Sequence, residues 1–398
     1  MYLDKNKEED NKMKNEIISE IEKIKESLWD INDYIYCNPE LGDQEFKAVE
    51  KLTSFLEKHS FNIETGIANR ETSFKAEFDS GIEGPTIAYM CEYDALPGIG
   101  HGCGHNMIGT MGAGAGVALS KVINKIGGKV VVFGTCAEET NGAKVDMAEQ
   151  GLFNNVDVAM MLHPNNVTCE SGTSLAMEAI EFDFFGQTSH AAASPEKGIN
   201  ALDAVILTFN GVNALRQHVT SDVRMHGIIS EGGVAANIVP DKAVAKFYVR
   251  AEKKKYLKEV VEKVKNIARG AALMTGARLE ISNYESSFDD MNTNKNLSKI
   301  FNKNLEGLGV EVKEAEKVSG SLDMGNVSYV VPSIHPMIGI GNVNLVGHTV
   351  EMAEATITKE AHEAIVKGVT ALAFTGYDVI SDKNLLAEIK KEFKETVK

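Results

Sequence analysis

Side chains that can bind a metal ion or move a proton are concentrated in three short segments of this chain. The segments are EYDALPGIGHGCGHN (92–106), CAEE (136–139) and the dipeptide His163-Pro164. They contain Asp94, His101, Cys103, His105, Glu138, Glu139 and His163. Thiolate, imidazole and carboxylate groups together suit zinc or a similar borderline divalent ion. A carboxylate beside a metal ligand can also take a proton from water, so the adjacent glutamates Glu138 and Glu139 could divide these two tasks.

Each segment has a plainer interpretation when it is taken alone. A Cys-Gly-His sequence can be a turn that buries a thiol, and a Glu-Glu pair is usually a solvated part of a loop. A histidine that ends a strand is more often packed or exposed than bound to a metal. What favours a site is that each segment follows an apolar run suited to a buried strand, because ligands collect beyond the carboxyl ends of the strands in an open parallel sheet.

The apolar runs alternate with helical stretches along this part of the chain. Thr86–Cys91, Lys129–Gly134 and residues 156–162 are predicted strands, and residues 105–125 and 141–152 are predicted helices. Strand–helix–strand alternation with nearly continuous apolar strands predicts an α/β fold, in which helices cover both faces of a parallel-rich sheet. The three segments are then expected to meet at one edge of that sheet.

The middle of the chain has a different pattern. It predicts strands near 178–186, 223–230, 242–251 and 277–285, and helices at 199–217 and 254–273. That β-α-β-β-α-β order matches a split-βαβ, ferredoxin-like unit with one open sheet face. We therefore predict that residues 179–287 are inserted into a larger metal-binding domain formed by 15–178 and 288–398, which follows a polar, solvated tail at 1–14.

Length, charge and cysteine usage limit the class of protein. The 398 residues suggest two domains or one domain with a large insertion. The net charge of −16 argues against a nucleic-acid or anionic-membrane partner, because both need a basic surface. The five cysteines have no CxxC spacing, and no apolar run approaches the roughly 18 residues of a membrane span. With a polar N-terminus unlike a secretory signal, these features predict a cytoplasmic protein.

Taken in order, the three segments resemble those of the M20 metallopeptidase and amidohydrolase family. The branch that they resemble contains aminobenzoyl-glutamate hydrolases, auxin-conjugate hydrolases and aminoacylase-1-like dipeptidases. The resemblance extends from NPELGDQE (38–45) through GQTSHAAASPEKGINALDA (186–204) to GHT (347–349). It implies a catalytic domain interrupted by a smaller lid and dimerisation domain, and hence a homodimer formed through residues 179–287.

The resemblance also implies roles for residues at matching positions. It implies two divalent metal ions, for which zinc is preferred and manganese or cobalt are alternatives. The implied ligands are Cys103, His105, Glu139, His163 and His348. Cys103 would replace a bridging carboxylate, Glu138 would be the general base, and Asp94 would orient a ligand. In the inserted domain, the substrate's carbonyl oxygen and carboxylate would be held by His190, Asn237 and Arg250.

Some positions depart from the family pattern or depend on strand geometry. Cys37 stands where relatives commonly have a histidine before NPEL, and His101 is an additional imidazole two residues before Cys103. The sequence leaves the roles of both open. If the strands around Asn237 and Arg250 are antiparallel neighbours, these two side chains are expected to reach the same opening beside the sheet.

The predicted reaction is hydrolysis of an amide bond. The substrate would be an N-acyl amino acid, an aminobenzoyl-glutamate-like compound or a small dipeptide with a free carboxylate. Glu138 would take a proton from the attacking water and return it to the leaving amine, while His190 would stabilise the oxyanion. Two alternatives stay open: a non-catalytic metal-binding scaffold of the same fold, and a metal-dependent deacetylase or carbamoyl hydrolase.

Overall fold

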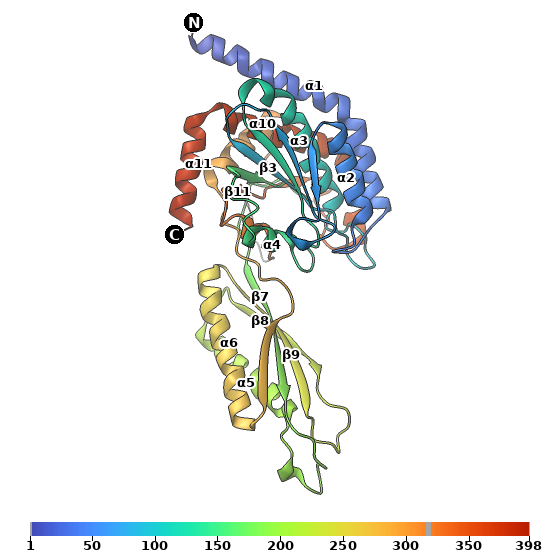
Figure 1. The fold of residues 1–398 in the computed structure, drawn as a ribbon, viewed down its shortest axis with the longest axis vertical. Coiled ribbons are helices and arrows are strands. Elements are labelled where there is room, and N and C mark those ends of the chain that lie inside the picture. The colour runs from blue at the N-terminus through green and yellow to red at the C-terminus, as the bar shows by residue number, and fades with distance from the viewer. Residues whose placement is uncertain (1, 316–319, 398) are drawn as a thin grey trace. The chain divides into compact units, whose positions relative to one another are not determined.

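The computed structural model describes residues 2–315 and 320–397, with side chains from Glu8 onward (Figure 1). The chain forms two compact units. Unit 1 consists of Met1–Thr173, Met291–Val318 and Asp323–Lys398, and unit 2 consists of Ser174–Asp290 and Ser319–Leu322. Unit 2 thus interrupts unit 1, within limits a few residues wider than the 179–287 of the sequence prediction.

Unit 1 is built on a six-stranded sheet with the strand order β1-β2-β4-β3-β5-β11. The strands are β1 (Asn62–Thr65), β2 (Phe74–Asp79), β3 (Thr86–Cys91), β4 (Lys129–Gly134), β5 (Val158–Met160) and β11 (Ser333–Ile334). Strands β4, β3, β5 and β11 run parallel, whereas β1 and β2 add an antiparallel pair. The predicted parallel-rich α/β fold is confirmed. The sequence prediction missed both β1 and β2. β1 is four residues long and mostly exposed, and only two residues of β2 are fully buried, so no apolar run marks either strand.

Helices pack against this sheet and against one another. Helix α3 (His105–Ile126) contacts β3 and β4, and both α1 and α10 contact α3. The close approach of α3 to β3 requires glycine, because a Cβ on Gly112 would come within 2.6 Å of the carbonyl oxygen of Met90. The other helices of unit 1 are α2 (Phe46–Lys58), α4 (Ala143–Glu149), α7 (Lys295–Gly307), α8 (Met324–Val327), α9 (Val350–Ala355), α11 (Lys383–Thr396) and the 3-10 turn η1 (Ile67–Asn69).

The N-terminal region differs from its prediction. Helix α1 spans Tyr2–Cys37, so most of the predicted tail at 1–14 is helical, and Met1 lies outside the described residues. The end of that segment is anchored, because Met13 is buried and the Lys14 ammonium lies 2.7 Å from Asp378 of α10. Polar composition gave no sign of these two contacts.

Helix α10 (Lys359–Ser381) is the one described helix that is long and apolar enough to cross a membrane. However, 78% of its apolar stretch is buried inside the fold. A helix that is apolar all round and buried in this way is typical of a protein core.

Unit 2 is a four-stranded antiparallel sheet, with the order β10-β7-β9-β8, packed against two helices. Its elements are β7 (Ala176–Phe185), the 3-10 turn η2 (Pro195–Lys197), α5 (Ala201–Leu215), the 3-10 turn η3 (Arg216–His218), β8 (Arg224–Glu231), β9 (Lys242–Ala251), α6 (Lys254–Thr275) and β10 (Arg278–Asn283). The predicted β-α-β-β-α-β order is confirmed. Phe182, Phe184 and Phe247 join the core with α5 and α6, because alternate residues of a strand face the same side.

Candidate metal centre

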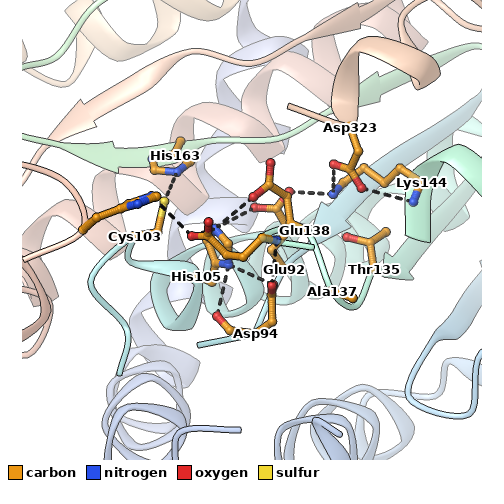
Figure 2. Close-up of polar contacts among 12 residues, drawn as sticks. Glu92, Asp94, Cys103, His105, Thr135, Ala137, Glu138, Lys144, His163 and Asp323 are labelled. Carbon is orange, nitrogen blue, oxygen red and sulfur yellow. Dashed lines mark hydrogen bonds and ion pairs between the residues drawn. The ribbon is translucent and has the colours of Figure 1, made fainter. Parts of the chain in front are cut away.

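The three segments singled out from the sequence meet in unit 1, beyond the carboxyl ends of β3, β4 and β5 (Figure 2). Residues 92–94 follow β3 directly, and residues 136–139 follow β4. After β5, the short strand β6 (His163–Asn165) pairs in parallel with β12 (Met337–Gly339). Seven of the predicted site residues are neighbours there: Asp94, Cys103, His105, Glu138, Glu139, His163 and His348.

Two groups of ligand-type side chains share Cys103. One group is Cys103, His105 and His163, the other is Cys103, Glu139 and His348, and the ligand atoms of each group lie within 4.8 Å of one another. The Cys103 sulfur lies 3.4 Å from His163 Nε2, and Glu139 Oε1 lies 3.5 Å from His348 Nε2. This geometry fits two divalent ions on either side of a shared thiolate.

Hydrogen bonds orient two of the imidazoles toward such ions. His105 Nδ1 lies 2.9 Å from the carboxylate of Asp94, and His163 Nδ1 lies 2.6 Å from the carbonyl oxygen of Pro164. Because these oxygens can only accept, each Nδ1 carries a proton, which leaves Nε2 as the atom that faces a metal ion. His105 Nε2 and Glu139 Oε1 are buried without a hydrogen-bond partner among the described residues. Metal coordination would satisfy both atoms, so the donor set fits the ions that the family implies.

The electrostatics of the site favour a bound cation. Burial lowers the pKa of His105, but Asp94, Cys103 and Glu92 outweigh it and raise the pKa well above its ordinary value. Burial lowers the pKa of His163 to about 3, so this imidazole is neutral and able to bind a metal. Burial also raises the pKa of the Cys103 thiol to about 12, and metal coordination is what would deprotonate it.

Gly104 fixes the turn between the two ligands of the Cys-Gly-His sequence. Its φ is +81°, a left-handed conformation that favours glycine. A Cβ at this position would lie 2.4 Å from Cγ of Pro164, the residue that follows His163. The turn therefore lies directly against the His163 segment, which brings Cys103 and His163 together.

The backbone of Glu138 is held on both sides by carboxylates. The Ala137 N–H donates to Glu45 Oε1 at 2.8 Å, and the Glu139 N–H donates to Asp94 Oδ2 at 3.0 Å. Ala137 itself has a φ of +58°, which an alanine rarely adopts, so its hydrogen bond to the Glu45 carboxylate stabilises a strained turn. The Glu138 side chain is 13% exposed, which leaves its carboxylate accessible beside the ligands.

The sequence analysis missed a buried charged network behind Glu138. The Lys144 ammonium lies 2.5 Å from Glu92 Oε1 and 2.7 Å from Asp323 Oδ1, and all three side chains are almost completely buried. Glu92 could have been found, because it follows β3 directly. Nothing in the local sequence marked Lys144 or Asp323.

Three further residues near the site carry imidazole or thiol groups. His335, which follows β11, is buried with its ring centroid 5.5 Å from that of His163. Its position just beyond the carboxyl end of a strand could have identified it from the sequence. His101 is buried with both ring nitrogens unpartnered among the described residues, but it joins no ligand group there. Cys37 is exposed at the end of α1.

His190 and Asn237 lie together in unit 2. The Ala192 and Ala193 N–H groups donate to His190 Nδ1 at 3.2 and 3.1 Å, so the imidazole proton is on Nε2. The Ala191 N–H donates to the carbonyl oxygen of Asn237 at 3.0 Å. His190 thus offers an N–H donor, which is the form that could bind an oxyanion.

The sequence predicts that Asn237 and Arg250 reach the same opening, and within one chain this prediction is wrong. Asn237 precedes β9, whereas Arg250 is near the last residue of β9 and pairs with Arg224 at the start of β8. The eight steps from Lys242 to Arg250 span roughly 27 Å in an extended strand. The strands are antiparallel neighbours, which was the condition of that expectation, but the pairing places these two side chains at opposite ends of the strand.

Comparisons with known proteins agree with this geometry. A peptidase dimerisation domain model matches residues 175–273. The Xaa-Arg dipeptidase of Mus musculus is 36% identical over 96% of this chain and 92% of its own length. A p-aminobenzoyl-glutamate hydrolase chain of Escherichia coli is 35% identical over 65% of this chain and 58% of its own length.

Solved structures share the fold. The aminobenzoyl-glutamate utilization protein of Klebsiella pneumoniae has a TM-score of 0.73 at 20% identity and covers 89% of this chain and 96% of its own. The YXEP protein of Bacillus subtilis, a dinuclear metal binding peptidase of the M20 family, has a TM-score of 0.67 at 19% identity, covering 90% and 99%. With its full-length similarity to a dipeptidase, this chain belongs to the M20 family of metal-dependent peptidases and amidohydrolases.

Proposed function

We propose that this hydrolase cleaves the amide bond of a dipeptide or N-acyl amino acid that carries a free carboxylate, with Glu138 as the general base. The observation that carries the proposal is the position of Glu138 beside the ligand atoms. Its Oε2 lies 3.9 Å from His105 Nε2, and one atom each of His105, Glu138 and Glu139 lies within 4.8 Å of the others. A base at this distance can reach a water that lies between the ligands and the substrate.

Cys103, His105, Glu139, His163 and His348 would hold two divalent ions, with zinc preferred and manganese or cobalt as alternatives. The mixture of sulfur, nitrogen and oxygen donors supports a borderline ion. When bound, the ions would supply Lewis-acid polarisation of the substrate carbonyl and lower the pKa of water.

The chain's own residues would then move the proton. Glu138 would accept it from the attacking water and deliver it to the nitrogen of the leaving amine, so the carboxylate is regenerated in each cycle. Asp94 would hold His105 in the orientation described above. His190, with its proton on Nε2, would donate a hydrogen bond to the oxygen that becomes negative in the transition state.

The substrate's free carboxylate would be bound by Arg250. A guanidinium group presents a planar fork of donors that matches a carboxylate, and Arg250 Nε is buried without a hydrogen-bond partner among the described residues. Because the Mus musculus relative is an Xaa-Arg dipeptidase, dipeptides with a basic C-terminal residue are the first substrates to test.

The opposite positions of Arg250 and His190 support a homodimer in which one chain's Arg250 works with the partner's His190 and Asn237. The free edge of β8 supports this dimer, because Ile228 and Ile229 on that strand are 62% and 45% exposed. The test mixes H190A and R250A chains, each of which is expected to be impaired as a homodimer on a free-acid substrate at a concentration below KM. Recovery of activity in mixed dimers is expected, and its absence would contradict shared sites.

The test of the base separates Glu138 from Glu139. E138Q is expected to keep two metal ions per chain and to lose kcat by at least ~10²-fold, the low end for acid–base catalysis. E139Q is expected to lose metal. Reversed behaviour of the two variants would contradict the proposal, and a panel of acyl-amino acids, dipeptides and carbamoyl compounds would identify the substrate class.

We also propose a cytoplasmic location. All five cysteines are free, and the site depends on the thiol of Cys103. A reducing compartment would protect this thiol from oxidation. Loss of activity on mild oxidation, with recovery after reduction, would support the dependence on a reduced thiol.

A further inference from the structure

A second charged cluster lies directly behind the candidate general base. Glu92, Glu138 and Asp323 each place a carboxylate oxygen within 4.8 Å of the other two, which is an arrangement able to hold a metal ion. The ammonium of Lys144 lies among them, 2.5 Å from Glu92 and 2.7 Å from Asp323 (Figure 2).

Three separate elements build this cluster. Glu92 follows β3, Lys144 lies in the first turn of α4, and Asp323 precedes α8. Asp323 binds Lys144 twice, since its Oδ2 also accepts from the Lys144 backbone N–H at 3.2 Å. The side chains of Lys144 and Asp323 are fully buried, and that of Glu92 is 2% exposed. The Lys144 ammonium is therefore held in place by these contacts, and, unlike a free ion, it cannot leave the cluster for the solvent.

A cation is required at this position, because several carboxylates buried together would repel one another without one. An ammonium and a divalent ion meet this need differently. A lysine donates hydrogen bonds from a single positive charge, whereas a metal ion would take a carboxylate oxygen as a ligand. A metal among these three carboxylates would thus occupy the oxygen that Glu138 needs for a proton.

We propose that Lys144 acts as a resident cation that excludes metal from this cluster and so keeps the carboxylate of Glu138 free for proton transfer. Lys144 is then a positioning residue, acting on Glu138 through the pocket that it shares with Glu92 and Asp323. The inference rests on the proposed role of Glu138, but the exclusion of metal can be measured without any activity.

The experiment uses the metal-loaded enzyme and the variant K144M, which keeps the side-chain length and removes the charge. Metal per chain is measured by elemental analysis after equilibration with zinc, together with kcat and KM. Wild type is expected to hold two zinc ions, whereas K144M is expected to take up a third at raised zinc concentration. Its kcat is expected to fall by at least ~10²-fold, with KM within about threefold of wild type.

The double variant K144M/D323N removes both the ammonium and one oxygen of the cluster. It is expected to hold only two zinc ions and to recover much of the kcat that K144M loses, because no third ion then occupies the carboxylate of Glu138. Compared with K144M, the double variant has one fewer buried carboxylate that lacks a counter-ion. It therefore keeps the proposal testable if K144M alone does not fold. A double variant that holds two zinc ions and still has the low kcat of K144M would overturn the proposal, because the loss of kcat would then not come from a third ion.

A matched control is K265M in unit 2, because the Lys265 ammonium forms a partly buried ion pair with Glu178 at 2.8 Å. K265M is expected to hold two zinc ions and to keep wild-type kcat. The proposal is overturned if K144M binds no more zinc than K265M, or if its kcat is unchanged. E138Q measured in parallel separates the two claims: full activity of E138Q would refute the proposed base, while the zinc count of K144M would still decide whether Lys144 excludes metal.

Discussion

Glu45 is expected to make the stability of unit 1 depend on pH near neutrality. Its carboxyl group is completely buried, and it accepts hydrogen bonds from Thr72 Oγ1 at 2.7 Å and from the Ala137 N–H at 2.8 Å. The variant E45Q tests this, because a glutamine side chain accepts from Ala137 through its oxygen and donates to Thr72 through its amide nitrogen. The hydrogen bonds are kept and only the ionisable group is removed.

The magnitude follows from the pKa of Glu45. Burial, with a smaller contribution from the Asp94 carboxylate, outweighs the hydrogen bond from Thr72 and raises this pKa from 4.5 to about 7. A pKa that is higher in the folded state contributes stability that is complete below the unfolded value and is lost as the pH rises through the folded value. At 1.36 kcal/mol per pKa unit, wild type is expected to lose about 2 to 3 kcal/mol relative to E45Q between pH 5 and pH 8.

The assay is denaturant unfolding of the metal-free proteins, followed by tryptophan fluorescence. Trp29 in α1 is the only tryptophan of the chain, so the signal reports on unit 1 alone. Ionisable groups other than Glu45 are the same in both proteins and cancel in the comparison. A difference in unfolding free energy between E45Q and wild type that stays constant from pH 5 to pH 8 would refute the reasoning.

Three further predictions concern the ligands, the turn and the substrate carboxylate. Cys103→Ala is expected to lower the metal content below two ions per chain and to abolish hydrolysis, because both ligand groups include Cys103. Removal of the metal with a chelator should also abolish hydrolysis. Unchanged metal content in Cys103→Ala would contradict this prediction. Gly104→Ala is expected to lose about 1–2 kcal/mol of stability for its left-handed φ alone, and more from overlap with Pro164, by the same fluorescence assay. Arg250→Ala is expected to raise KM for free-acid substrates, at a cost of roughly 1.5–3 kcal/mol for the lost charged hydrogen bond, and to leave KM for the matching amides nearly unchanged. Equal losses on the acid and the amide would mean that Arg250 has only a structural role.

The sequence predicted the parts of the fold that apolar runs determine. β3 and β4 are apolar after their first residues, Thr86 and Lys129, and their carboxyl ends must meet in a parallel sheet, so the convergence of Asp94 and Glu138 followed from topology alone. β1 escaped prediction because its side chains are mostly solvated and its position depends on pairing with β2. The predicted solvated tail at residues 1–14 was wrong at its end for a related reason, since the contact of Lys14 with α10 holds the end of that segment.

Residues that act only through tertiary contacts escaped prediction. Lys144 and Asp323 are separated by 179 positions in the sequence, and each alone resembles an ordinary surface charge. The prediction of a shared opening for Asn237 and Arg250 failed for a different reason, namely the distance along one strand. β8 and β9 are antiparallel neighbours, as that expectation required, but the ten residues of β9 separate Asn237, which precedes the strand, from Arg250 near its end.

The charges of the site give a reason for its proton chemistry. The carboxylates in or beside the ligand groups are Glu92, Asp94, Glu138, Glu139 and Asp323. Lys144 balances one of them, and the Cys103 thiolate would add one negative charge when metal is bound. Two divalent ions would then leave one negative charge uncompensated. Asp94 is committed to His105, Glu139 to the metals, and Glu92 and Asp323 to Lys144, so Glu138 is the carboxylate on which that charge, and hence an incoming proton, would reside.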